Sequence, residues 1–204
     1  MYGLKDPFFN DTKYADLGTD PASVVPLDSG DLVESTDIDV YTDQSLTDGP
    51  GGVSTWSDLL SYMENKDGWY RELGQESQYE GERVLTEAKI LGGIVLTPTF
   101  IPNQDPCGFG GFSNLYGLYF ETGTSYIAET FLGGTESVLV DGSTKTKVDP
   151  FIELGLGMGS SVGLHVGQEE GAKGYVQQST GVVQDVDINP AFKVKSGLIY
   201  WREH

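Results

Sequence analysis

Apolar and polar side chains alternate with a period of two through most of the chain after Trp69. This alternation predicts β-strands that each bury one face. Turn-forming Gly, Asp and Pro residues separate the strands at intervals of roughly ten to fifteen residues, a spacing typical of sandwiches, barrels and propellers rather than βαβ units. The sequence therefore predicts an all-β fold of antiparallel sheets. The predicted strands are 83–88, 89–100 (interrupted by Gly92-Gly93), 115–120, 127–132, 138–140, 145–152, 162–166, 175–178, 182–188 and 198–201.

Two prolines bear on the longest predicted strand. Proline has no N–H to give to a sheet ladder and is confined to edge strands, strand starts and bulges. Pro98 and Pro102 therefore predict that 89–100 does not form a long, regular central strand.

One short helix is predicted before the strands begin. Ser54 or Thr55 can cap its N-terminus, and apolar residues follow at positions i, i+3, i+4 and i+7. Gly68 can end it. The apolar positions are Trp56, Leu59, Leu60 and Met63.

The segment 1–67 is otherwise rich in turn-forming dipeptides such as Asp6-Pro7 and Asp20-Pro21. Between the turns, Ile38 and Val40 share one face of a short strand. We expect a single region over 1–204, in which 1–67 is the turn-rich segment with the helix and 68–204 supplies the strands.

Charge and composition exclude several classes of partner. The 204 residues include 31 acidic and 12 basic side chains, which gives a net charge of −19. Nucleic-acid phosphates and anionic membrane surfaces repel such a chain. The longest apolar run, Ile90–Ile94, contains two glycines and is far shorter than the ~20 residues of a membrane-spanning helix. The sequence therefore predicts neither a nucleic-acid partner nor a membrane span.

The best candidate for a metal site is the run Asp185, Asp187 and Asn189, where oxygen ligands alternate as they do in calcium loops. Pro190 stands where such a loop needs glycine, and no glutamate follows at the required distance. The preferred interpretation is a strand with a solvated acidic face, so no metal site is assigned. The same interpretation applies to Asp37, Asp39 and Asp43.

No catalytic residue is assigned either. Cys107 would need a histidine to generate its thiolate, and the sequence holds only His165 and His204. We expect Cys107 to pack as a thiol or to bridge to a cysteine elsewhere, and His165 to be structural. The glycine-rich run 155–161 lacks the Lys-Ser/Thr ending of a phosphate-binding loop. Among 31 carboxylates, close pairs occur by chance, and none of Glu76, Glu80, Glu82, Glu169 and Glu170 is singled out.

Aromatic side chains offer one further possibility, a platform on which sugar rings stack. In strands, such residues more commonly pack between sheets, so we expect a core role. The residues are Trp69, Phe112, Tyr116, Tyr119 and Tyr126.

An ordered set of short motifs runs through the chain. It comprises Tyr2–Pro7, Gly68–Leu73, Gly81–Leu85, Gly92–Pro102, Asp105-Pro106-Cys107, Leu115–Leu118, Thr122-Gly123 and Ser196–Glu203. This set resembles the C-terminal propeller of the PilC/PilY family of type IV pilus biogenesis factors and pilus-tip adhesins. The resemblance is densest between residues 68 and 123.

The resemblance implies a partial β-propeller made of the C-terminal blades, with antiparallel sheets and one short helix. It implies a non-enzymatic module that acts in pilus biogenesis and in surface or host-cell adhesion. The protein would be exported to the pilus tip, outer membrane or cell surface. Its partners would be minor pilins, the pilus tip and the upstream part of the same protein, since the chain is expected to be part of a longer one.

Full-length members of the family bind calcium through an Asp-rich loop, and that loop is not found in this sequence. We therefore expect no cofactor in this chain. The alternative is a β-propeller enzyme of the quinone-dependent dehydrogenase or glycosidase type, whose blades carry similar Gly-Gly and Leu-Tyr elements. A calcium- or carbohydrate-binding β domain without a pilus role is a third possibility.

Overall fold

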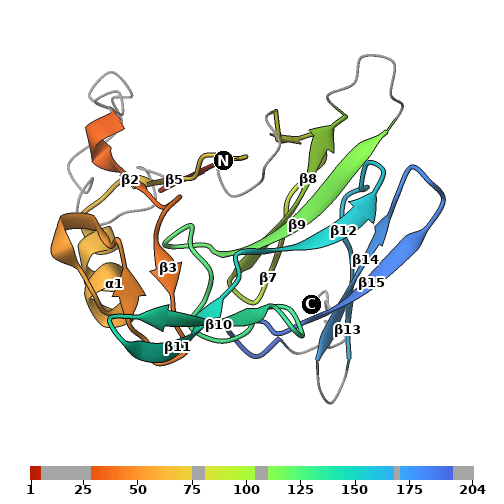
Figure 1. Ribbon diagram of the computed structural model, residues 1–204. Coiled ribbons are helices and arrows are strands. Elements are labelled where there is room, and N and C mark those ends of the chain that lie inside the picture. The colour runs from red at the N-terminus through yellow and green to blue at the C-terminus, as the bar shows by residue number, and fades with distance from the viewer. Residues whose placement is uncertain (6–28, 75–80, 104–109, 168–170, 195–204) are drawn as a thin grey trace, which may run out of the picture.

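A computed structural model describes residues 1–5, 29–74, 81–103, 110–167 and 171–194. Its described part is built from several small sheets and one α-helix, and the strands pair antiparallel as predicted except for one parallel pair (Figure 1). Within the described ranges, no helix is long and apolar enough to cross a membrane.

The largest sheet has five strands. β9 (Gly111–Tyr119) and β8 (Ile94–Pro102) form its centre, β12 (Phe151–Leu156) pairs with β9, and β6 (Arg83–Val84) and β7 (Lys89–Leu91) both pair with β8. The two central strands are buried along most of their length, which explains why their sequences are more uniformly apolar than those of the other strands.

The glycines at 92 and 93 form a hairpin turn rather than an interruption within one strand. Leu91 pairs with Ile94, and both glycines have positive φ, 51° and 85°. Two consecutive positive φ values define the tight turn that matches the twist of antiparallel strands, and glycine adopts them without steric cost.

The prediction that prolines exclude a long central strand was wrong. β8 spans nine residues with Pro98 in its middle, opposite Leu115 of β9. On its other side, β7 pairs with 94–96 and β6 with 99–100. Pro98 therefore lies at the junction between two partner strands, where a missing N–H removes no ladder hydrogen bond.

A mixed sheet of three strands lies beside the large one. β5 (Gly68–Tyr70) is its centre, antiparallel to β1 (Tyr2–Leu4) and parallel to β2 (Leu32–Glu34). Since β5 pairs with strands from the turn-rich segment, the two parts of the chain on either side of residue 68 share this sheet.

The third sheet has the order β13 (Gly163–Val166), β14 (Ala172–Gln177) and β15 (Val183–Ile188), all antiparallel. Single bridges join Phe131 to Ile188 and Gly159 to Gln178. These bridges connect the third sheet to the segments on either side of β12.

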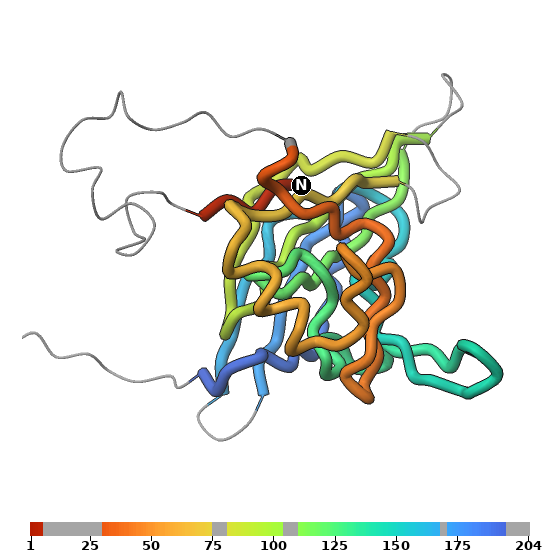
Figure 2. The backbone as a smooth tube through the Cα atoms, turned by 90° about the vertical axis from the view of Figure 1, so that its left-hand side faces the viewer, coloured from red at the N-terminus to blue at the C-terminus, as the bar shows by residue number. Residues whose placement is uncertain are grey.

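Two hairpins complete the strands. β3 (Asp39–Val40) pairs with β4 (Leu46–Thr47), and β10 (Thr135–Val140) pairs with β11 (Ser143–Val148). Figure 2 shows the β10–β11 hairpin projecting from the body of the molecule. The tip of this projecting hairpin is Asp141-Gly142, with φ of 49° and 79°.

The helix α1 (Trp56–Glu64) forms where predicted. Thr55 caps it: its hydroxyl accepts a hydrogen bond from the Asp58 amide at 3.3 Å and donates one to the Asp58 carboxylate at 2.7 Å. The helix ends at Asn65 and not at Gly68, because Gly68 already belongs to β5. Two single 3₁₀ turns, η3 (Ser29–Asp31) and η4 (Pro50–Gly52), precede it.

Three other predicted strands differ from the structure. Only 83–84 of 83–88 is a strand. The segment 127–132 contributes a single bridge at Phe131, and 145–152 is divided into β11 and β12 by Asp149-Pro150. Alternation alone did not predict these breaks, because each depends on where a partner strand ends. The predicted strand 198–201 lies outside the described residues.

Candidate functional site

A polar cleft of about 1230 Å³ lies between the N-terminal part of the molecule and the base of the β10–β11 hairpin. Carboxylates dominate its lining, with Lys66 and Lys147 as the two cations and Tyr62 and Phe151 among the apolar residues. We call this feature the acidic cleft. Its carboxylates are Glu34, Asp37, Asp39, Asp48, Glu136, Asp149 and Glu153.

Lys147 has carboxylates near it on three elements. Its ammonium lies 2.6 Å from the Asp39 carboxylate on β3, and Glu136 is its cross-strand partner on β10. Asp149 follows two residues along the chain. Burial and the charge of Glu136 raise the pKa of the Asp149 carboxyl; Asp39 adds to this effect and Lys147 opposes it.

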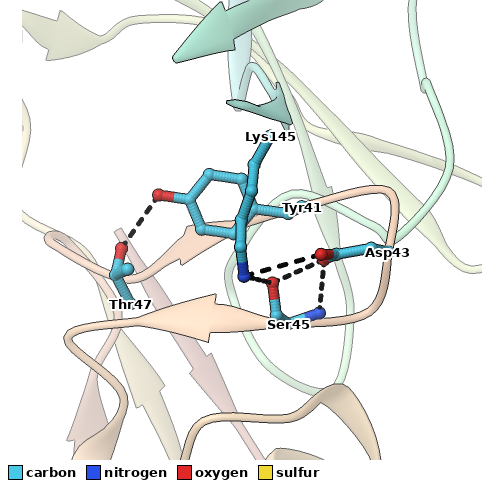
Figure 3. A network of polar contacts seen from close by, with 5 residues as sticks. All are labelled: Tyr41, Asp43, Ser45, Thr47 and Lys145. Atoms are coloured by element: carbon cyan, nitrogen blue, oxygen red, sulfur yellow. Dashed lines mark hydrogen bonds and ion pairs between the residues drawn. The ribbon is translucent and has the colours of Figure 1, made fainter. Parts of the chain in front are cut away.

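A second lysine, Lys145, belongs to a neighbouring polar network (Figure 3). Its ammonium donates to the Ser45 hydroxyl at 2.6 Å and lies 3.5 Å from the Asp43 carboxylate, above the ring of Tyr41. The Tyr41 hydroxyl shares a hydrogen bond of 3.2 Å with Thr47. Hydrogen bonds from Ser45, and then the charge of Lys145, lower the pKa of Asp43.

An apolar groove of about 930 Å³ runs between β1, the helix α1 and the strands β6–β8. Its lining includes unusually exposed apolar side chains: Tyr2 is 73% exposed, Ile90 67% and Leu4 57%. Trp69 and Met63 form part of its buried floor. Exposed apolar surface of this kind is typical of binding surfaces.

A buried carboxylate lies beneath the large sheet, and sequence reasoning did not single it out. Glu82 is 9% exposed and accepts hydrogen bonds from Thr99 (2.5 Å), Asn114 (3.0 Å), Tyr116 (3.2 Å) and the Gly74 amide (3.0 Å). Thr99 lies on β8, Asn114 and Tyr116 lie on β9, and Gly74 lies a few residues after β5. With its lone pairs satisfied by four donors, this carboxylate joins the β5–β6 connection to the central strands.

The calcium candidates lie together on β15 and just after it. The Lys173 ammonium is 3.2 Å from Asp185 and 3.0 Å from Asp187, while the side-chain amide of Asn189 donates to the Glu129 carbonyl at 3.1 Å. Both carboxylates therefore already have a cation between them. Across the described residues, no three His, Cys, Asp or Glu side chains gather in a way that could hold a metal ion.

The structure separates the remaining candidates. His165 is exposed on β13, opposite Lys173. The glycine-rich run begins inside β12, where Gly155 lies at a register shift against β9. The other candidates, Cys107, Glu76, Glu80, Glu169, Glu170 and His204, lie outside the described residues.

Most of the aromatic candidates pack in the core, as the sequence predicted. Trp69, Tyr116 and Tyr119 are at most 5% exposed, and Tyr126 is half-buried and stacks on Tyr119 with ring centroids 5.2 Å apart. Phe112 differs, since 42% of it is exposed. These residues do not form a shared exposed platform.

Comparison with known proteins identifies relatives. No protein-family model matches the chain. It is 31% identical over 159 residues to the type IV pilus biogenesis factor PilY1 of Pseudomonas aeruginosa strain UCBPP-PA14, an alignment that covers 76% of the chain. With PilY1 of strain PAK it shares 27% identity over 129 residues. The chain spans only 12% and 10% of the lengths of these relatives.

The fold has a counterpart among solved structures. The crystal structure of the Pseudomonas aeruginosa PilY1 C-terminal domain superposes with a TM-score of 0.53 and 19% identity, over 93% of this chain and 36% of that one. The predicted all-β, β-propeller-like fold class is thus confirmed. The chain is a member of the PilC/PilY family, and the part of that family which it resembles is the C-terminal domain of PilY1.

Proposed function

We propose that the chain is a non-enzymatic, β-propeller-like module of a type IV pilus biogenesis protein. The observation that carries this proposal is the 31% identity to a PilY1 pilus biogenesis factor across 76% of the chain. The shared fold with the PilY1 C-terminal domain supports it. In this role residues 1–204 act as one unit, exported to the pilus tip, outer membrane or cell surface.

The partners proposed for this module are minor pilins or the pilus tip, the upstream part of the same protein, and a surface or host-cell ligand to which it attaches. Two surfaces are suited to such contacts. The apolar groove offers exposed side chains of β1 and β7, and the acidic cleft offers a contrasting polar surface. No cofactor is proposed for this chain, because the Lys173 ammonium already pairs with both aspartates that came nearest to a calcium loop.

Complementation tests the proposal. In a Pseudomonas aeruginosa strain that lacks PilY1, a chimera carries this chain in place of the matching segment of the PilY1 C-terminal domain. We expect the chimera to restore surface pili, measured as pilin sheared from cells, above the level of the deletion strain. A chimera that is exported and resists proteolysis, yet restores no pili, would contradict the proposed role.

A matched variant and a second measurement sharpen this test. Leu118→Asp places a charge at a position of β9 that is 1% exposed, so this chimera should neither fold nor restore pili. Attachment of the same strains to a surface is measured separately. Restored pili without restored attachment would support the role in biogenesis and contradict the role in adhesion.

The non-enzymatic part of the proposal has its own test. The purified chain is assayed for alcohol oxidation with added quinone cofactor and for hydrolysis of aryl glycosides. We expect no turnover above the buffer rate, and turnover by the folded, purified chain would contradict the proposal.

A further inference from the structure

The β10–β11 hairpin, here called the arm, is fastened to the β3–β4 hairpin along one side. The Thr42 amide donates to the Thr146 carbonyl at 3.0 Å, and Tyr41 forms a bridge with Lys147. The two lysines of β11 extend the contact, since Lys145 reaches Asp43 and Ser45 while Lys147 reaches the β3 aspartate. Charged groups therefore make much of this contact.

The charges at the base of the arm are unbalanced. Lys147 is one cation among Asp39, Glu136 and Asp149. The rest of the cleft lining adds four carboxylates and one cation, Lys66. Asp149 is half-buried at the end of the arm, where its amide donates to the Gly134 carbonyl at 3.0 Å. A negative charge at this position is repelled by Glu136 on β10 and by Asp39 on β3, and it is attracted by Lys147 on β11.

We propose that the attachment of the arm is sensitive to pH, and that proton uptake by Asp149 in mild acid tightens it. Protonation removes one negative charge from the base of the arm while the lysine–aspartate contacts stay in place. At neutral pH the charge on Asp149 returns and the arm opens more often. Leu139, which is 76% exposed near the tip of the arm, is then held less firmly.

The order in which the carboxylates titrate defines the pH range in which the arm is attached most tightly. Burial and Glu136 raise the pKa of Asp149, whereas hydrogen bonds from Ser45 lower that of Asp43. On acidification Asp149 therefore takes up its proton before Asp43 does. At pH values between these two protonations, Asp149 is neutral and no longer repels its neighbours. Asp43 and Lys145 both remain charged, so their contact is kept.

Amide hydrogen exchange measures the opening directly. The Thr42 amide is protected only while the arm is attached, so its protection factor reports the attachment equilibrium. We expect protection to be about 2- to 5-fold greater at pH 4 than at pH 7.5, because the pKa of the Asp149 carboxyl is raised above its ordinary value of 3.8 while the arm is attached. In Asp149→Asn, protection should be high at both pH values.

Asp141→Asn is the matched control. It makes the same charge change at the exposed tip of the same arm, and asparagine tolerates the positive φ of 49° found there. We expect this variant to keep the pH dependence of the unmodified chain. Equal protection at the two pH values in the unmodified chain would overturn the proposal, as would persistence of the dependence in Asp149→Asn or its equal loss in Asp141→Asn.

Discussion

The indole N–H of Trp69 donates a hydrogen bond of 2.8 Å to the carbonyl oxygen of Phe120. Trp69 belongs to the three-stranded sheet, and Phe120 directly follows β9 of the five-stranded sheet, so this bond joins the two sheets. Gly3 and Gly123 lie against the same ring, one on each side of the junction. A Cβ at either position would lie 2.3 or 2.2 Å from an indole atom.

Gly3→Ala tests whether the ring is packed as tightly as this geometry indicates. The added methyl group must displace the indole, which strains both its packing and its hydrogen bond to Phe120. We expect a loss of about 1–3 kcal/mol in the free energy of unfolding, measured with urea. Gly30→Ala is the control, since no atom lies within 4 Å of its added Cβ. An equal effect of the two variants would contradict the packing described here.

Glu82 supports a second prediction. In Glu82→Gln the side chain keeps its size, but an NH₂ group replaces an oxygen that accepts two hydrogen bonds, so buried donors of Thr99, Asn114, Tyr116 or Gly74 lose their acceptor. We expect about 1–3 kcal/mol of destabilisation by urea unfolding. Glu87→Gln is the control, because its exposed pairing with Lys89 should contribute nothing measurable. If Glu82→Gln were as stable as the control, the carboxylate would not be a structural anchor.

Local signals in the sequence were sufficient for the helix and for some of the strands. Thr55 and the apolar spacing after it act within two turns of helix, so neighbouring residues determine the outcome. In the same way, alternation located β13 and β15 to within one residue. The strand after Arg83 was predicted too long, since Val84 ends its pairing with β8 and nothing in the local pattern indicates where a partner ends.

The candidate surfaces depended on long-range contacts and could not be predicted. Glu82 has the same local sequence signal as any exposed glutamate, and only the register of β8 against β9 places Thr99 and Asn114 beside it. Likewise, Lys147 and Asp39 are far apart in the sequence. The excess of acidic residues predicted a negative surface but not the cleft in which it is concentrated.

Calcium gives a third prediction. The ammonium of Lys173 lies between Asp185 and Asp187. A calcium ion would have to displace this ammonium, and it would then have only these two carboxylates as ligands. We expect millimolar calcium to leave the thermal midpoint of the purified chain unchanged, and the chelator EDTA to have no effect either. A midpoint that rises with calcium, and stops rising in Asp185→Asn, would show that the aspartates bind the ion after all.

The Asp43 network predicts how stability depends on acid. Hydrogen bonds from Ser45 and the charge of Lys145 lower the folded-state pKa of Asp43 below its ordinary value of 3.8. A carboxyl group with a depressed folded-state pKa stabilises the fold above its unfolded-state pKa, and this stabilisation is lost as the pH falls through the folded-state value. Asp43→Asn should therefore lower the thermal midpoint at pH 7 and have little effect near pH 2.

The size of this effect is limited by solvent. The Asp43 side chain is 54% exposed, so the loss at pH 7 should be at most about 1 kcal/mol and should shrink in 1 M salt. Asp37→Asn, an exposed neighbour outside this network, serves as the control and should shift the midpoint less. A deficit in Asp43→Asn that persisted unchanged at pH 2 would mean that the variant disturbs packing, and that the charged contact with the arm contributes nothing to stability.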